Sequence, residues 1–315
     1  MAVLLARTAD RLYWGARYVE RAEDTARIVR AYHDLVVDFP SVELLRWEPL
    51  AALTGSADAA AVPVEDPSGE RTILRHLLAD ASNPGSIVSA VTAARENLRT
   101  TREVMPREAW QTVNQLSQYV SATASGAVER QLRDRFLARV VEISRRLDGI
   151  LESTMSRSDE FRMLRLGRLI ERAEMTTRVL GVAAAGILQL EAADRESLVH
   201  DEIRWMNVLR SVSALQMYQR AVRGPIDGTA VVRFLLSYAA FPRSVQGCFD
   251  EVRTVLLGLP SPQDVLAQLD RTEAILAAAY PTAAAAPLDA AMDRVQLAIV
   301  ALDRAVHDRY VASVL

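Results

Sequence analysis

An eleven-residue charged stretch occurs twice in this chain and limits what it can fold into. Residues 17–27 read RYVERAEDTAR, and residues 168–178 read RLIERAEMTTR, at a shift of 151 residues. Seven of the eleven positions are identical, and six of those seven are polar or charged. Apolar positions recur in any two amphipathic helices, whereas charged positions recur only when the copies share an origin or a chemical role. The motif Arg-x-x-Glu-Arg-Ala-Glu-x-Thr-x-Arg therefore indicates an internal duplication.

Hydrophobic periodicity places both copies on long helices, over residues 8–38 and 160–189. In each helix, apolar or small residues recur at steps of three and four, and every position of the second stripe lies 151 residues after its counterpart. The motif is therefore expected on the same face of both helices. The two stripes consist of Leu12, Gly15, Val19, Ala22, Ala26 and Val29, and of Met163, Leu166, Ile170, Ala173, Thr177 and Leu180.

The rest of the chain also has the pattern of helices, and no stretch shows the sustained alternation typical of a strand. Proline and glycine positions divide it, and residues 54–70 have the composition of a surface loop. The sequence thus predicts an all-α protein. The further helices are expected over 41–53, 71–80, 87–104, from 106 through 114, 127–153, 195–222, 228–240, 243–257, 262–280 and 287–312.

The duplication extends beyond the motif. Arg46-Trp47 aligns with Arg204-Trp205 at a shift of 158, and residues 84–87 align with residues 242–245 at the same shift. We therefore predict one large helical bundle over residues 1–315, built from two halves, 1–155 and 156–315, around an approximate two-fold axis. The two motif helices are expected to lie side by side near that axis.

Composition excludes several kinds of chemistry. All 37 basic residues are arginine, so no Schiff-base, P-loop or pyridoxal lysine is present. The net charge of −3 provides no field that would attract nucleic acid or an anionic membrane. The single cysteine, Cys248, rules out an internal disulfide. With no secretory signal pattern and no apolar run long enough to span a bilayer, we expect a soluble cytoplasmic protein.

The motif allows three interpretations. On a helical wheel, Glu20, Glu23 and Arg27 fall on one flank of the apolar stripe and would be partly dry, while Arg17, Arg21 and Asp24 fall on the opposite side. The first interpretation is an ordinary salt-bridged helix face, and the second is a buried Glu–Arg lattice that holds two helices in register. The third is a site, because arginine forks suit carboxylates and phosphates, and a glutamate among them can accept a proton.

On the third interpretation, Glu20 and Glu171 are the candidate catalytic bases. The candidate ligand-binding residues of the motif are its arginines: Arg17, Arg21, Arg27, Arg168, Arg172 and Arg178. A second candidate cluster, which could equally be a solvated arginine face, comprises Arg95, Glu96, Arg99, Trp110 and Asn114. Arg243 opens a predicted helix, where it could either cap the helix or hold an anion. The four histidines fit no metal-binding pattern, so we expect neither a metal nor a cofactor.

At residues 13–23, the chain resembles the bacterial alpha-E domain family, which is named for a helical domain with a Glu-Arg motif. The resemblance covers essentially the whole chain. One departure is Glu174, where many relatives are expected to have aspartate. The matching residues include Ala94-Arg95-Glu96-Asn97-x-Arg99, Trp110-x-x-x-Asn114, Glu171-Arg172-Ala173, Trp205 and residues 241–245, which read FPRSV.

The resemblance implies an all-helical fold and an association with a circularly permuted ATP-grasp ligase, which occurs beside members of the family or fused to them. Transglutaminase-like and proteasome-like peptidase proteins often accompany them. ATP-grasp enzymes join a carboxylate to an amine through an acyl phosphate. The chain has neither the lysines nor the glycine-rich loops for ATP, so it is not expected to be the ligase itself.

Three functions remain open at this point. The chain could be an accessory subunit that binds an amino acid or peptide for the ATP-grasp ligase during peptide or amide-bond formation. It could instead be a stand-alone acyl- or aminoacyl-transfer enzyme that uses Glu20 or Glu171 as the base. The third alternative is a non-catalytic helical scaffold.

Overall fold

A computed structural model describes residues 5–38, 47–54, 69–191, 197–279 and 285–312. These residues form helices and turns with no strand, which confirms the all-α class. The elements are α1 (Ala6–Asp38), η1 (Glu48–Thr54), α2 (Glu70–Leu78), α3 (Ile87–Arg99), η3 (Arg102–Val104), α4 (Arg107–Thr123), η4 (Gly126–Val128), α5 (Arg130–Thr154), α6 (Asp159–Glu191), α7 (Ser197–Ser211), α8 (Leu215–Val222), α9 (Gly228–Ser237), α10 (Val245–Leu257), α11 (Gln263–Ala279) and α12 (Ala285–Tyr310).

Most predicted helices are confirmed within a few residues. The hydroxyl of Ser86 accepts a hydrogen bond from the amide of Ser89 at 3.1 Å and caps α3. The hydroxyl of Ser244, its counterpart in the second half, accepts one from the amide of Gly247 at 2.9 Å and caps α10. Of the predicted helix over 41–53, the described part is η1. Most of the predicted loop over 54–70 lies outside the described residues.

Two predicted helices were too long. The helix expected over 87–104 ends at Arg99, where Thr100 and Thr101 bond back to the carbonyls of Asn97 and Leu98. The helix expected over 195–222 is two helices, α7 and α8, because Ser213 adopts a left-handed conformation at φ 56°. The last carbonyl of α7, at Ser211, accepts a hydrogen bond from Arg27 on α1 at 2.6 Å, so a distant residue caps this helix end.

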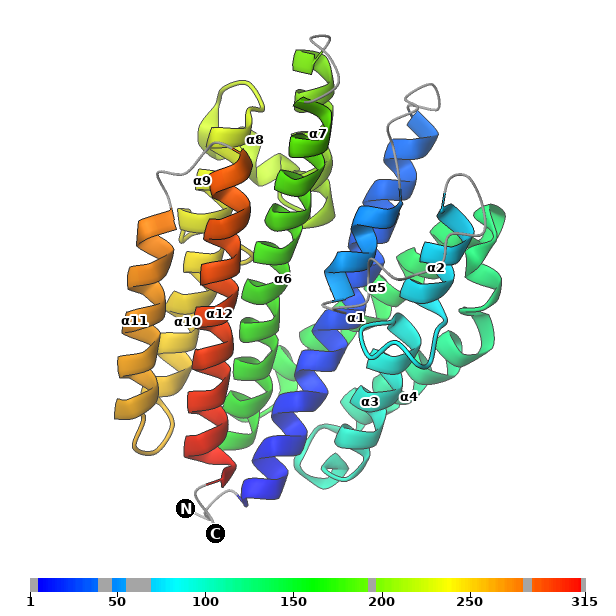
Figure 1. The fold of residues 1–315 in the computed structure, drawn as a ribbon. Coiled ribbons are helices and arrows are strands. Elements are labelled where there is room, and N and C mark those ends of the chain that lie inside the picture. The colour runs from blue at the N-terminus through cyan, green and yellow to red at the C-terminus, as the bar shows by residue number, and fades with distance from the viewer. Residues whose placement is uncertain (1–4, 39–46, 55–68, 192–196, 280–284, 313–315) are drawn as a thin grey trace.

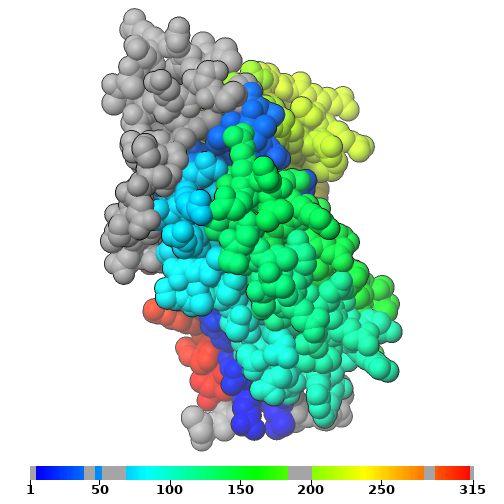
Figure 2. Space-filling model, turned by 90° about the vertical axis from the view of Figure 1, so that its right-hand side faces the viewer, coloured from blue at the N-terminus to red at the C-terminus, as the bar shows by residue number. Residues whose placement is uncertain are grey.

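Helices α1 and α6 lie side by side in the middle of the bundle and run in the same direction (Figure 1). Helices α3 and α5 pack on α1, and helices α10 and α12 pack on α6. Figure 2 shows the face on which the helices of the first half cover α1. Each central helix therefore has neighbours on several sides, which explains why the polar motif residues are buried along with the apolar stripe.

The contact between α1 and α6 depends on a glycine. A Cβ atom at Gly167 would overlap the backbone carbonyl of Tyr13, so the two helix backbones touch at this point. A Cβ atom at Gly15 would meet a side chain instead, with Leu98 Cδ2 at 2.6 Å. The close approach at Gly167 brings the motif residues of the next two turns within reach of one another. No helix in the described part of the chain is long and apolar enough to cross a membrane.

Candidate functional site

The two motifs meet in a lattice of arginines and carboxylates between α1 and α6. Arg21 on α1 bonds to both oxygens of Glu171 on α6, at 2.5 and 2.9 Å. Arg172 on α6 bonds to both oxygens of Glu20 on α1, at 2.8 and 2.9 Å. The Arg of each Glu-Arg pair thus binds the Glu of the other pair, as in an isologous contact between two copies. This reciprocity agrees with the predicted two-fold relation at the helix pair, while the relation of the complete halves remains a prediction.

Each lattice arginine near the start of a motif also reaches an aspartate on an outer helix. Arg17 bonds to Asp303 on α12 at 2.6 Å and to Glu171 at 2.8 Å. Arg168, its counterpart, bonds to Asp148 on α5 at 2.8 Å. Our sequence-based analysis missed both aspartates. A sequence signal existed, because each follows a leucine, at 147–148 and 302–303, a separation close to that of the motif.

The first motif carries an extra carboxylate, and Arg243 compensates it. Asp24 lies one position after Glu23, whereas the second motif has Met175 at that place. Arg243, at the start of α10, bonds to Glu20 at 2.7 Å, to Glu23 at 3.0 Å and to Asp24 at 2.9 Å. The residue aligned with Arg243 in the first half is Gly85, so the second motif has no equivalent of this arginine.

Glutamate–arginine pairs four positions apart, a spacing that predicts pairing on a helix, also form within each motif helix. Glu23 and Arg27 approach to 3.3 Å, and Glu174 and Arg178 to 2.5 Å. Arg27 also pairs with Asp24, and Arg145 of α5 reaches Glu23 at 3.2 Å. The flank of Glu20, Glu23 and Arg27 is buried, as predicted, and Arg17 and Asp24 on the opposite side are buried as well. Arg17 is covered because it reaches Glu171 on α6 and Asp303 on α12, and Asp24 bonds to Arg243.

The arginines determine the charge state of the motif glutamates. Burial alone would raise the pKa of Glu171, but Arg21 and Arg17 outweigh it and lower that pKa to about 2. Burial likewise opposes ionisation of Glu20, and Arg172 and Arg243 hold the pKa of that carboxyl well below its ordinary range. Both glutamates are therefore anions at neutral pH. All four oxygens accept hydrogen bonds from arginines and only 2% and 1% of the residues are exposed, so both carboxylates are held in fixed positions away from solvent.

Asp24 behaves differently from these glutamates. Burial and the neighbouring charges of Glu20 and Glu23 raise the pKa of Asp24 to about 7, although Arg27 and Arg243 act in the opposite direction. As the pH falls, Asp24 therefore takes up a proton well before Glu20, whose pKa is lowered. The second motif has no such group, because Met175 replaces it.

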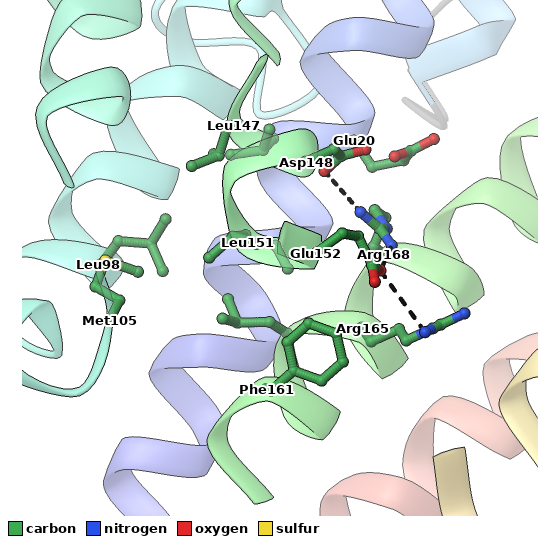
Figure 3. A pocket seen from close by; sticks show the side chains of 13 residues that line it. Glu20, Leu98, Met105, Leu147, Asp148, Leu151, Glu152, Phe161, Arg165 and Arg168 are labelled. Carbon is green, nitrogen blue, oxygen red and sulfur yellow. Dashed lines mark hydrogen bonds and ion pairs between the residues drawn. The ribbon is translucent and has the colours of Figure 1, made fainter. Parts of the chain in front are cut away.

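One small cavity adjoins the lattice, among α1, α3, α5 and α6 (Figure 3). Its apolar side consists of Leu98, Met105, Leu147, Leu151 and Phe161. Its polar side consists of Glu20, Asp148, Glu152, Arg165 and Arg168. Its volume of about 20 Å³ is enough for a water molecule and far below that of an amino acid. Of the candidate residues of the two motifs, Glu20 and Arg168 line this cavity, whereas Arg17 and Glu171 do not.

Three carboxylates near the cavity have a spacing that a metal ion could use. Oxygen atoms of Glu20, Glu23 and Asp148 lie within 4.8 Å of one another. Each of these carboxylates already faces an arginine: Arg172 at Glu20, Arg243 at Glu23 and Arg168 at Asp148. Arginine therefore supplies the positive charge that a metal ion would supply elsewhere.

The second predicted cluster forms on the outer side of α3 and α4, apart from the lattice. Arg95 donates to Asn114 at 3.0 Å and to Glu96 at 2.9 Å, and its guanidinium lies 5.9 Å from the ring centre of Trp110. Arg99 donates to Glu96 at 3.1 Å. All five residues are at least partly exposed. The structure thus brings the predicted residues together, as a surface group whose arginines share one glutamate.

The fold and the lattice define a class of protein: an all-helical bundle whose two central parallel helices are joined by an internal Glu–Arg lattice. Residues 4–311 match the family model Alpha-E, described as a predicted alpha-helical domain with a conserved ER motif. The chain therefore belongs to the Alpha-E family. Each copy of the repeated motif contains one Glu-Arg pair, Glu20-Arg21 in the first and Glu171-Arg172 in the second. Neither the curated proteins nor the solved structures include a match to this chain.

Proposed function

We propose that this protein is a non-catalytic accessory subunit of a circularly permuted ATP-grasp ligase in peptide or amide-bond formation. In this proposal, the Glu–Arg lattice is the rigid frame of the subunit, and the ligase supplies the chemistry. The observation that carries the non-catalytic part is the complete pairing of Glu20 and Glu171, whose four oxygens all accept hydrogen bonds from arginines.

The partner is proposed from the family resemblance and from what this chain lacks. Members of the family are expected to occur beside such a ligase, and a chain without lysine has no ammonium group with which to hold ATP phosphates. An accessory subunit needs a stable shape rather than a reactive site. Buried arginine–carboxylate pairs with good geometry provide such specificity, because any other arrangement of α1 and α6 leaves a buried charge unpaired.

Two features weigh against an independent transferase. A general base must be within reach of the substrate and have a pKa near the working pH, whereas Glu171 is buried, lies outside the cavity lining and has a pKa lowered to about 2. The cavity beside Glu20 is too small for an aminoacyl group. We therefore place any bound amino acid or peptide at the joint surface of the subunit and the ligase, not inside the lattice.

The test combines the protein with a purified circularly permuted ATP-grasp ligase of the kind that accompanies the family. We expect a complex on size-exclusion chromatography, and faster ATP- and amine-dependent phosphate release than with the ligase alone. No complex and no change in the rate of phosphate release would refute the proposal.

A second measurement separates this proposal from the enzyme alternative. The variant Glu171→Gln should lower the thermal stability of the protein. Neither the isolated wild-type chain nor this variant should show acyl-transfer activity. Turnover by the isolated wild-type chain that Glu171→Gln abolishes at unchanged melting temperature would establish the transferase instead.

A further inference from the structure

Helix α12 lies along the outside of the bundle next to α11 and α6, and its outer face has an unusual order of residues (Figure 1). Four residues at steps of four, three and four lie on one narrow stripe of this helix: Asp293, Leu297, Val300 and Arg304. All four are exposed: Leu297 to 69% and Val300 to 37%. The opposite side of α12 is buried and contains Val295, Ile299, Leu302 and Val306.

The stripe is complementary to itself. Asp293 and Arg304 lie at equal distances on either side of a midpoint between Ala298 and Ile299, and so do Leu297 and Val300. If a second α12 packs antiparallel about that midpoint, each Asp293 meets the other copy's Arg304, and each Leu297 meets the other copy's Val300. Among the described residues, neither Asp293 nor Arg304 forms a salt bridge within its own chain, so both are available.

We propose that two copies of this chain associate through the outer face of α12, as an antiparallel helix pair around a two-fold axis. The interface is isologous, so each favourable contact occurs twice. The charges select the orientation, because a parallel pair would place aspartate against aspartate and arginine against arginine. The apolar centre provides the attraction, and burying the two exposed aliphatic side chains removes apolar surface from water.

The ends of the stripe limit the size of the contact. Asp289 and Asp308 are also symmetric about the midpoint and carry like charges, but they lie about 14 Å from it along the helix, where crossing helices have diverged. On α11, which packs against α12, Ile275 is exposed as well. One helix face and part of its neighbour are smaller than a typical permanent interface, so the dimer should be reversible and dependent on concentration.

Sedimentation equilibrium across a concentration series tests the proposal, up to about 100 µM, where weak specific complexes form. The wild-type protein should shift from the 34.7 kDa of one chain towards twice that mass as its concentration rises. Leu297→Glu should abolish the shift. Leu257→Glu alters a leucine of similar exposure, 67%, on α10 and should leave the shift unchanged. Circular dichroism melts should show that both variants remain folded.

Charge exchange provides the decisive arm. Asp293→Arg alone and Arg304→Asp alone should each weaken self-association at least tenfold, because like charges then face one another twice. An equimolar mixture of these two variants should dimerise again, since each supplies the charge that the other lost. A wild-type chain that stays monomeric at the highest concentration would overturn the proposal. So would a dimer that survives Leu297→Glu, or a mixture of the charge variants that fails to associate.

Discussion

The two motif helices have nearly the same charged residues, yet their surroundings differ. Around Glu171 on α6, two arginines of α1, Arg17 and Arg21, provide the pairing. Around Glu20 on α1, one arginine comes from α6, namely Arg172, and the other from the start of α10, namely Arg243. The two environments therefore share one reciprocal contact but complete their charge balance with different elements. Asp24 and Arg243 are the two residues that distinguish the surroundings of the first motif from those of the second.

Among single substitutions in these two environments, we expect the removal of Arg243 to destabilise the protein most. Arg243→Ala leaves Glu20, Glu23 and Asp24 each short of a donor in a buried place, and we expect a loss of about 3–5 kcal/mol in the free energy of unfolding. Urea unfolding followed by circular dichroism measures it. Arg253→Ala, which removes a more exposed arginine bonded to Asp270 and Glu273, is the matched control and should lose less than about 1 kcal/mol. Equal losses in the two variants would show that the cluster of three carboxylates does not need Arg243.

The reciprocal pairs should respond alike. Arg21→Ala and Arg172→Ala each remove two hydrogen bonds from one buried glutamate, and each glutamate keeps one other arginine. We expect each variant to lose about 2–4 kcal/mol of unfolding free energy, with Arg172→Ala at the upper end because Arg172 is less exposed than Arg21. The same urea titration provides both values. A large effect of one variant and none of the other would contradict the equivalence of the two pairs.

The helix contact itself is asymmetric, and Gly167 tests it. At the shift of 151 residues, Gly167 corresponds to Ala16 on α1, so only α6 lacks a Cβ atom at this position. Gly167→Ala should lower stability by about 1–3 kcal/mol, because the added methyl overlaps the Tyr13 carbonyl and forces the helices apart. At Gly149 on α5, an added Cβ atom meets nothing within 4 Å, so Gly149→Ala should be neutral or stabilising. Melting temperatures of the two variants would show whether the contact is as tight as described.

The extra carboxylate of the first motif should make stability depend on pH. Because the folded protein holds the Asp24 proton up to about pH 7 and the unfolded chain releases it near pH 4, the folded state binds more protons between these values. The contribution of this group to stability is therefore complete below about pH 4 and is lost as the pH rises towards 7, at up to about 1.4 kcal/mol per pH unit.

Asp24→Asn should remove that slope, which unfolding titrations at pH 5, 6 and 7 would detect. The matched control is Met175→Leu, which alters the corresponding position of α6 without adding a charge and should keep the wild-type slope. A slope that persists in Asp24→Asn would mean that another group, and not Asp24, titrates in this range.

Much of the fold could be predicted from the sequence because helices depend on local patterns. The periodic stripe on residues 8–38 and 160–189 predicted α1 and α6, and the motif spacing predicted that their charged faces would match. The errors lay at helix ends, one of them closed by local bonds of Thr100 and Thr101 and the other contacted by a distant residue. Residues 195–222 have a continuous helical pattern, but the helix ends at Ser211, whose carbonyl is bonded to Arg27 of α1.

The candidate site could also be predicted only in part. The residue types of the lattice and the pairs Glu23–Arg27 and Glu174–Arg178 followed from spacing along one helix. The partners on other helices, Asp148, Asp303 and Arg145, did not, because nothing in a helical period says which outer helix will cover which flank.

By itself, the sequence determined that this chain is helical and carries two matching Glu–Arg motifs on long helices. Helix formation depends on the pattern of neighbouring residues, and a repeated motif can be recognised in the sequence directly. Only the tertiary structure decided that the matching residues neutralise one another. Whether a buried carboxylate is reactive depends on the charges within a few ångströms of it, and at Glu20 and Glu171 those charges come from residues roughly 150 to 220 positions away in the chain.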